Sequence, residues 1–136
     1  MRRNSLILLA LTIGLLFTVV PVLAHHAISA EFDSTKPIKF TGTVKSVDWM
    51  NPHIYVNVEA KDESGKTIVF SVEGGPPNSL FRQGWRPNTL KVGETVQVSG
   101  IRAKKADSHR VGTATITNSE GKRVFGGGGG GAAAQQ

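Results

Sequence analysis

Three histidines, His25, His26 and His53, are the residues of this chain best suited to bind a metal ion. If the chain is cut after Ala24, His25 carries both a free α-amine and an imidazole, and these two nitrogens can chelate one ion. The pKa of an α-amine is about 7.7 to 8.0, low enough for a metal to displace its proton at neutral pH. A third nitrogen from His26 or His53 would complete a site that suits Cu(II). Copper is therefore the one cofactor that the sequence suggests.

Other features disfavour a copper site. The third residue of the mature chain would be Ala27, where a histidine would complete an amino-terminal copper motif. The chain has no cysteine, and its two methionines, Met1 and Met50, offer little to Cu(I). In the alternative interpretation His25 and His26 are only a polar start and His53 only opens a strand.

The first 24 residues follow the plan of a secretory signal peptide. Arg2 and Arg3 precede an apolar run over residues 6–20, and Val22 and Ala24 provide the small residues that signal peptidase requires. The run is about 15 residues long, whereas a membrane-spanning helix needs about 20. We expect cleavage after Ala24 and a periplasmic or secreted protein; the alternative is an uncleaved membrane anchor.

The rest of the chain is predicted to form one small domain, residues 25–125, and a disordered Gly/Ala/Gln tail, residues 126–136. About 100 residues suffice for one core. The formal charge of +6 includes Arg2 and Arg3, so the mature excess is mild. Its densest basic group is expected to be a solvated rim rather than a nucleic-acid patch, and comprises Arg102, Lys104, Lys105 and Arg110.

Alternating apolar residues predict mainly β-strands. The first strand runs from Ile38 to Trp49 with a shift of parity that requires a bulge near Lys45-Ser46, eased by Gly42. Further strands are expected around residues 54–59, 68–72, 96–101, 111–117 and 122–125, and a short helix capped by Asn78 and ended by Gly84 follows the third strand. The strand count and the place of the helix predict a small OB-fold-like Greek-key barrel of five to six strands. The alternative is an open sandwich of the same strands.

Several motifs resemble those of a known family. They are His25-His26, Trp49-Met50-Asn51-Pro52-His53, Pro77-Asn78-Ser79-Leu80 and Gly84-Trp85. They are similar, over about residues 24–125, to small secreted bacterial proteins grouped as domain-of-unknown-function family 6152. The resemblance implies an envelope location, a barrel-like β domain and a pairing of the double-histidine start with the His53 motif, but no activity. The chain departs from the family's pattern after Arg102, in the loop that holds His109.

The ligand surface is predicted to be a rim of loops. Alternation directs Trp49 and Phe70 inward and leaves Tyr55 as the exposed aromatic ring, whereas a tryptophan beside a helix end, such as Trp85, often plugs a barrel. We predict the ligand-binding residues to be Asn51, His53, Tyr55, Arg82 and Trp85, and the metal ligands of the alternative to be His25, His26 and His53.

These observations favour a small secreted binding or accessory module of unknown ligand over an enzyme. None of the serines or carboxylates lies in a recognisable catalytic motif. We expect a monomer whose partner is a small molecule or an envelope protein, with membrane contact only through an uncleaved leader. Secretion disfavours nucleic acid. The alternative function is a periplasmic copper-binding protein.

Overall fold

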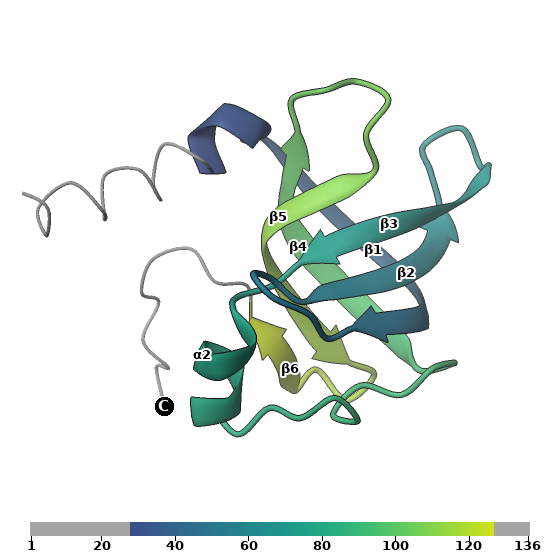
Figure 1. Cartoon of the computed structure of the whole chain (residues 1–136). Helices are drawn as coiled ribbons and strands as arrows, with labels where there is room; N and C mark the ends of the chain where they lie inside the picture. The colour runs from purple at the N-terminus through teal and green to yellow at the C-terminus, as the bar shows by residue number, and fades with distance from the viewer. Residues whose placement is uncertain (1–27, 127–136) are drawn as a thin grey trace, which may run out of the picture. The chain divides into compact units, whose positions relative to one another are not determined.

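The computed structural model describes residues 28–126 of the chain (Figure 1). The predicted leader, His25, His26 and tail residues 127–136 lie outside this range. The chain divides into two units, Met1–Ala30 and Glu31–Gln136. Residues 28–31 are helical.

The second unit consists of six strands and one short helix. The elements follow the order β1 (Phe32–Asp48), β2 (Tyr55–Lys61), β3 (Thr67–Glu73), α2 (Pro77–Arg82), β4 (Thr95–Ala103), β5 (Arg110–Asn118) and β6 (Arg123–Gly126). The predictions of a mainly β protein and of a helix between the third and fourth strands are therefore confirmed. No helix within residues 28–126 is long and apolar enough to cross a membrane.

All six strands belong to one sheet, in the order β3-β2-β1-β4-β5-β6 with antiparallel neighbours. An additional parallel pairing joins β3 to β5 and brings the outer part of the sheet back on itself. The long β1 makes this possible, since its first half pairs with β4 and its second half with β2. Figure 1 shows β1 crossing the molecule behind β3 and β2.

β1 changes partners through a bulge. Its register with β2 shifts between Val44 and Ser46, where the sequence predicted a change of parity. Just before this point β1 passes so close to β2 that a side chain would not fit. A Cβ atom added to Gly42 would lie 2.5 Å from the backbone oxygen of Glu59. Bulges increase local twist and bend a strand. This bend lets one strand serve both halves of the sheet.

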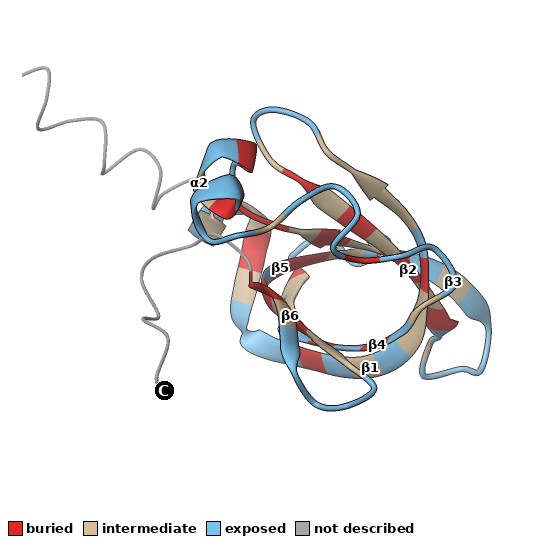
Figure 2. Cartoon of the chain, turned by 90° about the horizontal axis from the view of Figure 1, so that it is seen from below, coloured by how far each residue is buried: buried red, intermediate tan, exposed pale blue. Residues whose placement is uncertain are grey.

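The core lies on the concave side of the sheet. Buried and more exposed positions alternate along the strands in Figure 2, as expected for a sheet with one covered face. The rings of Phe40 and Phe70 stack with centroids 4.3 Å apart. The ring of Trp85 meets Phe125 of β6 edge-on at 5.6 Å, and Phe125 is almost fully buried. The short last strand is therefore part of the core.

Several predicted boundaries differ from the structure. β1 begins at Phe32, six residues before the predicted start at Ile38. The helix begins at Pro77, and Asn78 lies within it and does not cap it. Proline suits a first helical position because its ring fixes φ and the missing N–H would have had no partner there. Gly84 ends the helix with φ of 88°, as expected. Gly126, assigned to the tail, is buried as the last residue of β6.

Candidate functional site

Two of the predicted ligand residues, His53 and Tyr55, lie at the same end of β2 and β3. Tyr55 is the first residue of β2 and lies opposite Glu73, the last residue of β3. Both side chains project from the outer face, because Ile54 and Val56 take the inward positions and are fully buried. His53 precedes β2 in the loop that follows β1. Strand alternation thus directs the side chains of Tyr55 and Glu73 to the same side of the sheet.

Glu73 joins the histidine to an arginine. Its Oε1 lies 2.5 Å from Nδ1 of His53, and its Oε2 accepts a hydrogen bond of 2.5 Å from Nη2 of Arg110. Only 13% of the Glu73 side chain is exposed, so water contributes little to the solvation of its charge. A carboxylate in such a position needs a counter-charge, and Arg110 supplies it.

Arg110 has four partners of three kinds. Besides Glu73 it forms an ion pair with Glu31, and its Nη2 donates to the hydroxyl of Tyr55 at 3.2 Å. Its guanidinium carbon lies 5.5 Å from the ring centroid of Tyr55 and 5.8 Å from that of Phe32, within the range of cation–π attraction. Arg110 thus ties together the start of β1, the start of β2 and the end of β3.

We call Glu31, His53, Tyr55, Glu73 and Arg110 the Arg110 cluster. With a neutral His53, two carboxylates face one guanidinium, so the cluster carries one excess negative charge. His53 then donates its Nδ1 hydrogen to Glu73 and leaves a lone pair on Nε2. Within the described residues neither this Nε2 nor the Tyr55 hydroxyl hydrogen has a hydrogen-bonding partner. These two groups can meet a ligand.

The environment of Tyr55 changes its acidity. Burial raises the pKa of its hydroxyl above the ordinary value of 10.0, and the charge of Glu73 raises this pKa further. The positive charge of Arg110 lowers the pKa and Glu31 raises it, both to a smaller extent. The hydroxyl therefore remains protonated at neutral pH and can donate a hydrogen bond.

The other three predicted ligand residues lie outside the cluster. Asn51 is exposed in the loop between β1 and β2, and Arg82 is exposed at the end of α2. Trp85 is half-buried and turns its ring toward Phe125 in the core, which matches the role of a plug rather than of a rim residue. The structure thus joins His53 to Tyr55 and not to Arg82 or Trp85.

Arg110, the central residue of the cluster, was not among the predicted site residues. Arg110 was expected to belong to a solvated rim, but its side chain is only 34% exposed and is held between two carboxylates. The other three residues of this basic group fit a solvated rim better. Lys104 and Lys105 are exposed, and Arg102 pairs with Glu63, whose side chain is 89% exposed. The outward parity of Tyr55 and Glu73 was a usable signal. The position of Arg110 beside them depends on the β3–β5 pairing, which no local pattern reveals.

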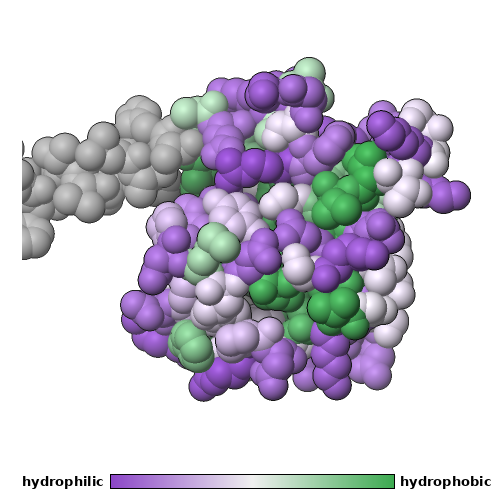
Figure 3. Space-filling view, turned by 45° about the vertical axis from the view of Figure 1, so that its right-hand side comes forward, coloured by the Kyte–Doolittle hydropathy of each residue, from purple (hydrophilic) through white to green (hydrophobic). Residues whose placement is uncertain are grey.

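Few large hydrophobic side chains are exposed within the part of the chain that the structure describes. The exposed ones within residues 28–126 are Met50, Val69, Phe81 and Val92, from four separate segments. Figure 3 shows one face of the molecule that is mostly hydrophilic, with small hydrophobic patches. Phe81 has partners of its own, since it meets Trp49 at 5.2 Å and Arg86 at 5.0 Å.

No group of three or more potential metal ligands is assembled within residues 28–126. His53 is the one predicted metal ligand inside this range, and the positions of His25 and His26 are not described.

A comparison of the sequence with protein families gives one match. The profile of a family described as of unknown function (DUF6152) matches residues 14–114, which is most of the chain. The chain belongs to this family. The resemblance noted from the motifs is thereby confirmed, although the match starts and ends earlier than expected. No curated protein and no solved structure matches the chain. All five residues of the Arg110 cluster fall inside the range matched by family 6152, whereas β6 falls outside it.

Replacement of Arg110 by methionine should destabilise this member of family 6152 by about 1 to 3 kcal/mol, because Glu73 would keep a poorly solvated charge without a partner. Urea unfolding measures the loss. The matched control Arg102→Met breaks the exposed pair with Glu63 and should cost less than about 0.5 kcal/mol. The double variant Arg110→Met/Glu73→Gln should recover part of the loss. Equal stability of the two single variants would contradict a stabilising role for the cluster.

Ultraviolet titration should give a pKa above 10.0 for Tyr55, which is the chain's only tyrosine and therefore the sole source of the phenolate signal. Glu73→Gln should lower this pKa by removing a negative charge, and Arg110→Met should raise it. Because the folded state holds this proton more tightly than the unfolded chain, the associated stability is present below pH 10 and lost above it. An unshifted pKa in the wild type would place Tyr55 in solvent and outside the cluster.

Proposed function

We propose that this protein is a secreted, periplasmic binding module, not an enzyme, whose ligand contacts the Arg110 cluster. The observation that carries the proposal is the bridge of Glu73 between His53 and Arg110. This bridge holds His53 at the surface and leaves its Nε2 without a partner within the described residues. The Tyr55 hydroxyl accepts a hydrogen bond from Arg110 and can still donate its own hydrogen. We propose binding rather than turnover because both carboxylates of the cluster are already paired with Arg110.

The proposed framework is an OB-like Greek-key barrel. Pairings lead from β1 through β2, β3, β5 and β4 back to β1, and α2 follows β3; both features support this assignment. In OB-folds the outer surface of strands two and three, flanked by the first and fourth loops, is the usual binding face. Here that surface includes Tyr55 and Glu73, the first loop carries His53, and the loop between β4 and β5 ends at Arg110.

The proposed secretion is supported by the sequence of the first 24 residues, where a basic start, an apolar run and Ala24 follow each other in the order of a signal peptide. A secreted domain without cysteines must rely on its core and its ion pairs.

The charge of the cluster limits the ligand class. With a neutral His53, the cluster offers one excess negative charge, an imidazole acceptor and a hydroxyl donor, which together favour a cationic or neutral polar ligand over an anionic one. Nucleic acid is disfavoured on the same ground. A small amine or a cationic segment of an envelope protein would fit.

The test is an NMR titration of the isotope-labelled chain with fractions of a periplasmic extract from native cells. We expect at least one fraction to shift the signals of His53, Tyr55 and their neighbours. The variant His53→Ala/Tyr55→Phe should lose these shifts. Arg82→Ala should retain them, because Arg82 lies at the end of α2 and outside the cluster. Lys91→Ala, in an exposed loop away from the cluster, is the matched control. Shifts confined to other surfaces, or unchanged in the double variant, would reject the cluster as the binding site.

A copper-binding function is the second candidate, and the orientation of His53 favours it. Histidines that bind metals usually donate their second ring N–H to a carboxylate, which fixes the ring and raises its basicity. The contact between His53 Nδ1 and Glu73 Oε1 has this form. In this proposal the mature α-amine and imidazole of His25 bind Cu(II) together with His53 or His26.

Calorimetry with Cu(II) on the chain that starts at His25 distinguishes the candidates. A copper site should lose at least tenfold in affinity when one residue is added before His25, and Glu73→Gln should weaken it by about 10- to 100-fold if His53 is a ligand. His109→Ala removes the fourth histidine of the chain, which lies in the loop between β4 and β5 with its ring edge-on to Phe70, and should leave the affinity unchanged. Equal affinity of the extended and native chains would exclude the amine as a ligand.

A further inference from the structure

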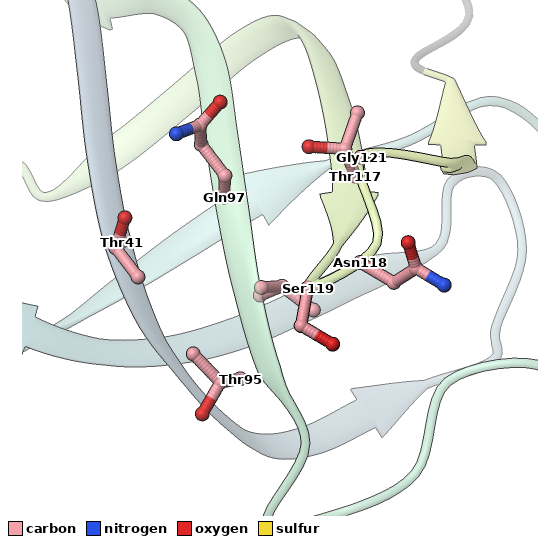
Figure 4. Close-up of a pocket in the computed structure, with 8 residues that line it drawn as sticks. Thr41, Thr95, Gln97, Thr117, Asn118, Ser119 and Gly121 are labelled. Atoms are coloured by element: carbon pink, nitrogen blue, oxygen red, sulfur yellow. The ribbon is translucent and has the colours of Figure 1, made fainter.

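The outer face of β1, β4 and β5 holds a hollow of about 260 Å³ that plays no part in the Arg110 cluster (Figure 4). It lies beside the turn that joins β5 to β6. The residues that line it are Thr41, Thr95, Val96, Gln97, Thr117, Asn118, Ser119 and Gly121. Its size is below that of a typical drug-sized pocket, so a ligand of one or two small rings is the largest that fits.

Strand register arranges the polar groups of the hollow. Gln97 of β4 lies opposite Thr41 of β1 on one side and opposite Thr117 of β5 on the other, so the three side chains form a row across three strands. Adjacent strands are about 4.8 Å apart, so the row spans roughly 10 Å. Figure 4 shows these three residues on neighbouring ribbons. The row is thus a fixed array of two hydroxyls and one amide.

The turn that forms the side of the hollow is fixed by its own hydrogen bonds. The side-chain oxygen of Asn118 accepts the backbone N–H groups of Glu120 and Lys122, and Gly121 adopts φ of 77°. A side chain at position 121 would be strained, because L-residues rarely adopt this conformation. The wall of the hollow is therefore preformed.

The chemistry of the lining is neutral and rich in hydrogen-bonding capacity. None of the lining residues is charged, although the chain has an excess of basic residues. Within the described residues, the side chains of Thr41, Thr95, Gln97 and Thr117 have no hydrogen-bonding partner. Each hydroxyl can donate once and accept twice, and the amide can do both. Threonine methyl groups add small apolar contacts between these polar atoms.

We propose that this hollow binds a neutral polyhydroxylated ligand, namely a sugar ring of an envelope glycan. A sugar presents closely spaced hydroxyls that both donate and accept, with C–H groups between them, and it carries no charge to be neutralised. The site has no aromatic platform, so the affinity should be weak, with a Kd in the millimolar range. The site shares no residue with the Arg110 cluster and, unlike the cluster, has no charged side chain in its lining.

NMR titration of the full chain tests this proposal. The probes are glucose and N-acetylglucosamine, with glucuronic acid and glucosamine as charged analogues of similar size. We expect the neutral sugars to cause saturable shifts of the Gln97 side-chain amide and of the backbone signals of Thr41 and Thr117. Shifts confined to His53 and Tyr55 would reject this site, even if they support the other. No saturable shift with either neutral sugar up to about 100 mM would also overturn the proposal.

Matched variants separate the hydroxyls from the strand structure. Thr41→Val/Thr117→Val removes both hydroxyls but keeps the β-branched shape and the strand propensity. It should lower the affinity for the neutral sugars at least fivefold. Thr67→Val, which removes an exposed hydroxyl from β3 outside the hollow, should leave the affinity unchanged. Equal affinity of the double variant and the wild type would overturn the proposal, and the same spectra report whether each variant is folded.

Discussion

A parallel pairing of only two residue pairs determines how this chain is organised. Ser71 and Val72 of β3 lie beside Arg110 and Val111 of β5, and the N–H of Ser71 donates to the backbone oxygen of His109 at 3.0 Å. The contact brings together segments almost 40 residues apart, so its closure entropy must be offset by the core that it completes. It also positions a guanidinium next to a poorly solvated carboxylate. The fold and the charged cluster therefore depend on the same contact.

Local physics explains why much of the fold was predictable. The parity shift in β1 required a bulge because consecutive side chains of a strand point to opposite faces, and the bulge occurs between Val44 and Ser46. The glycine expected to end the helix was equally informative, since Gly84 adopts the positive φ that is common just after a helix. Each of these features is decided by a few neighbouring residues. The predicted helix start was wrong because another local effect competes with capping by Asn78. Proline favours the first helical turn, so the helix already begins at Pro77.

The candidate site was only partly predictable because its contacts are non-local. Alternation correctly directed Tyr55 outward, whereas His53, which was expected to open the same strand, lies in the loop before β2. The composition around Arg110 suggested a solvated rim, because four basic residues within nine positions resemble an exposed loop. The ion pairs with Glu31 and Glu73 span 79 and 37 residues of sequence, and no periodicity reveals such partners. A basic residue such as Arg110 that lies in a basic stretch of sequence can thus be paired in the fold with carboxylates from distant segments.

The burial of β6 has a practical consequence for producing the protein. The match to the family ends at position 114, in the middle of β5, yet Ile116 and Phe125 beyond it are almost fully buried. A recombinant fragment trimmed to that boundary would lose half of one strand and all of another, and would uncover the indole of Trp85. Such a fragment should precipitate or remain unfolded, whereas an affinity tag fused after Gly126 would leave every core residue in place. The folding unit is longer than the segment by which its relatives are recognised.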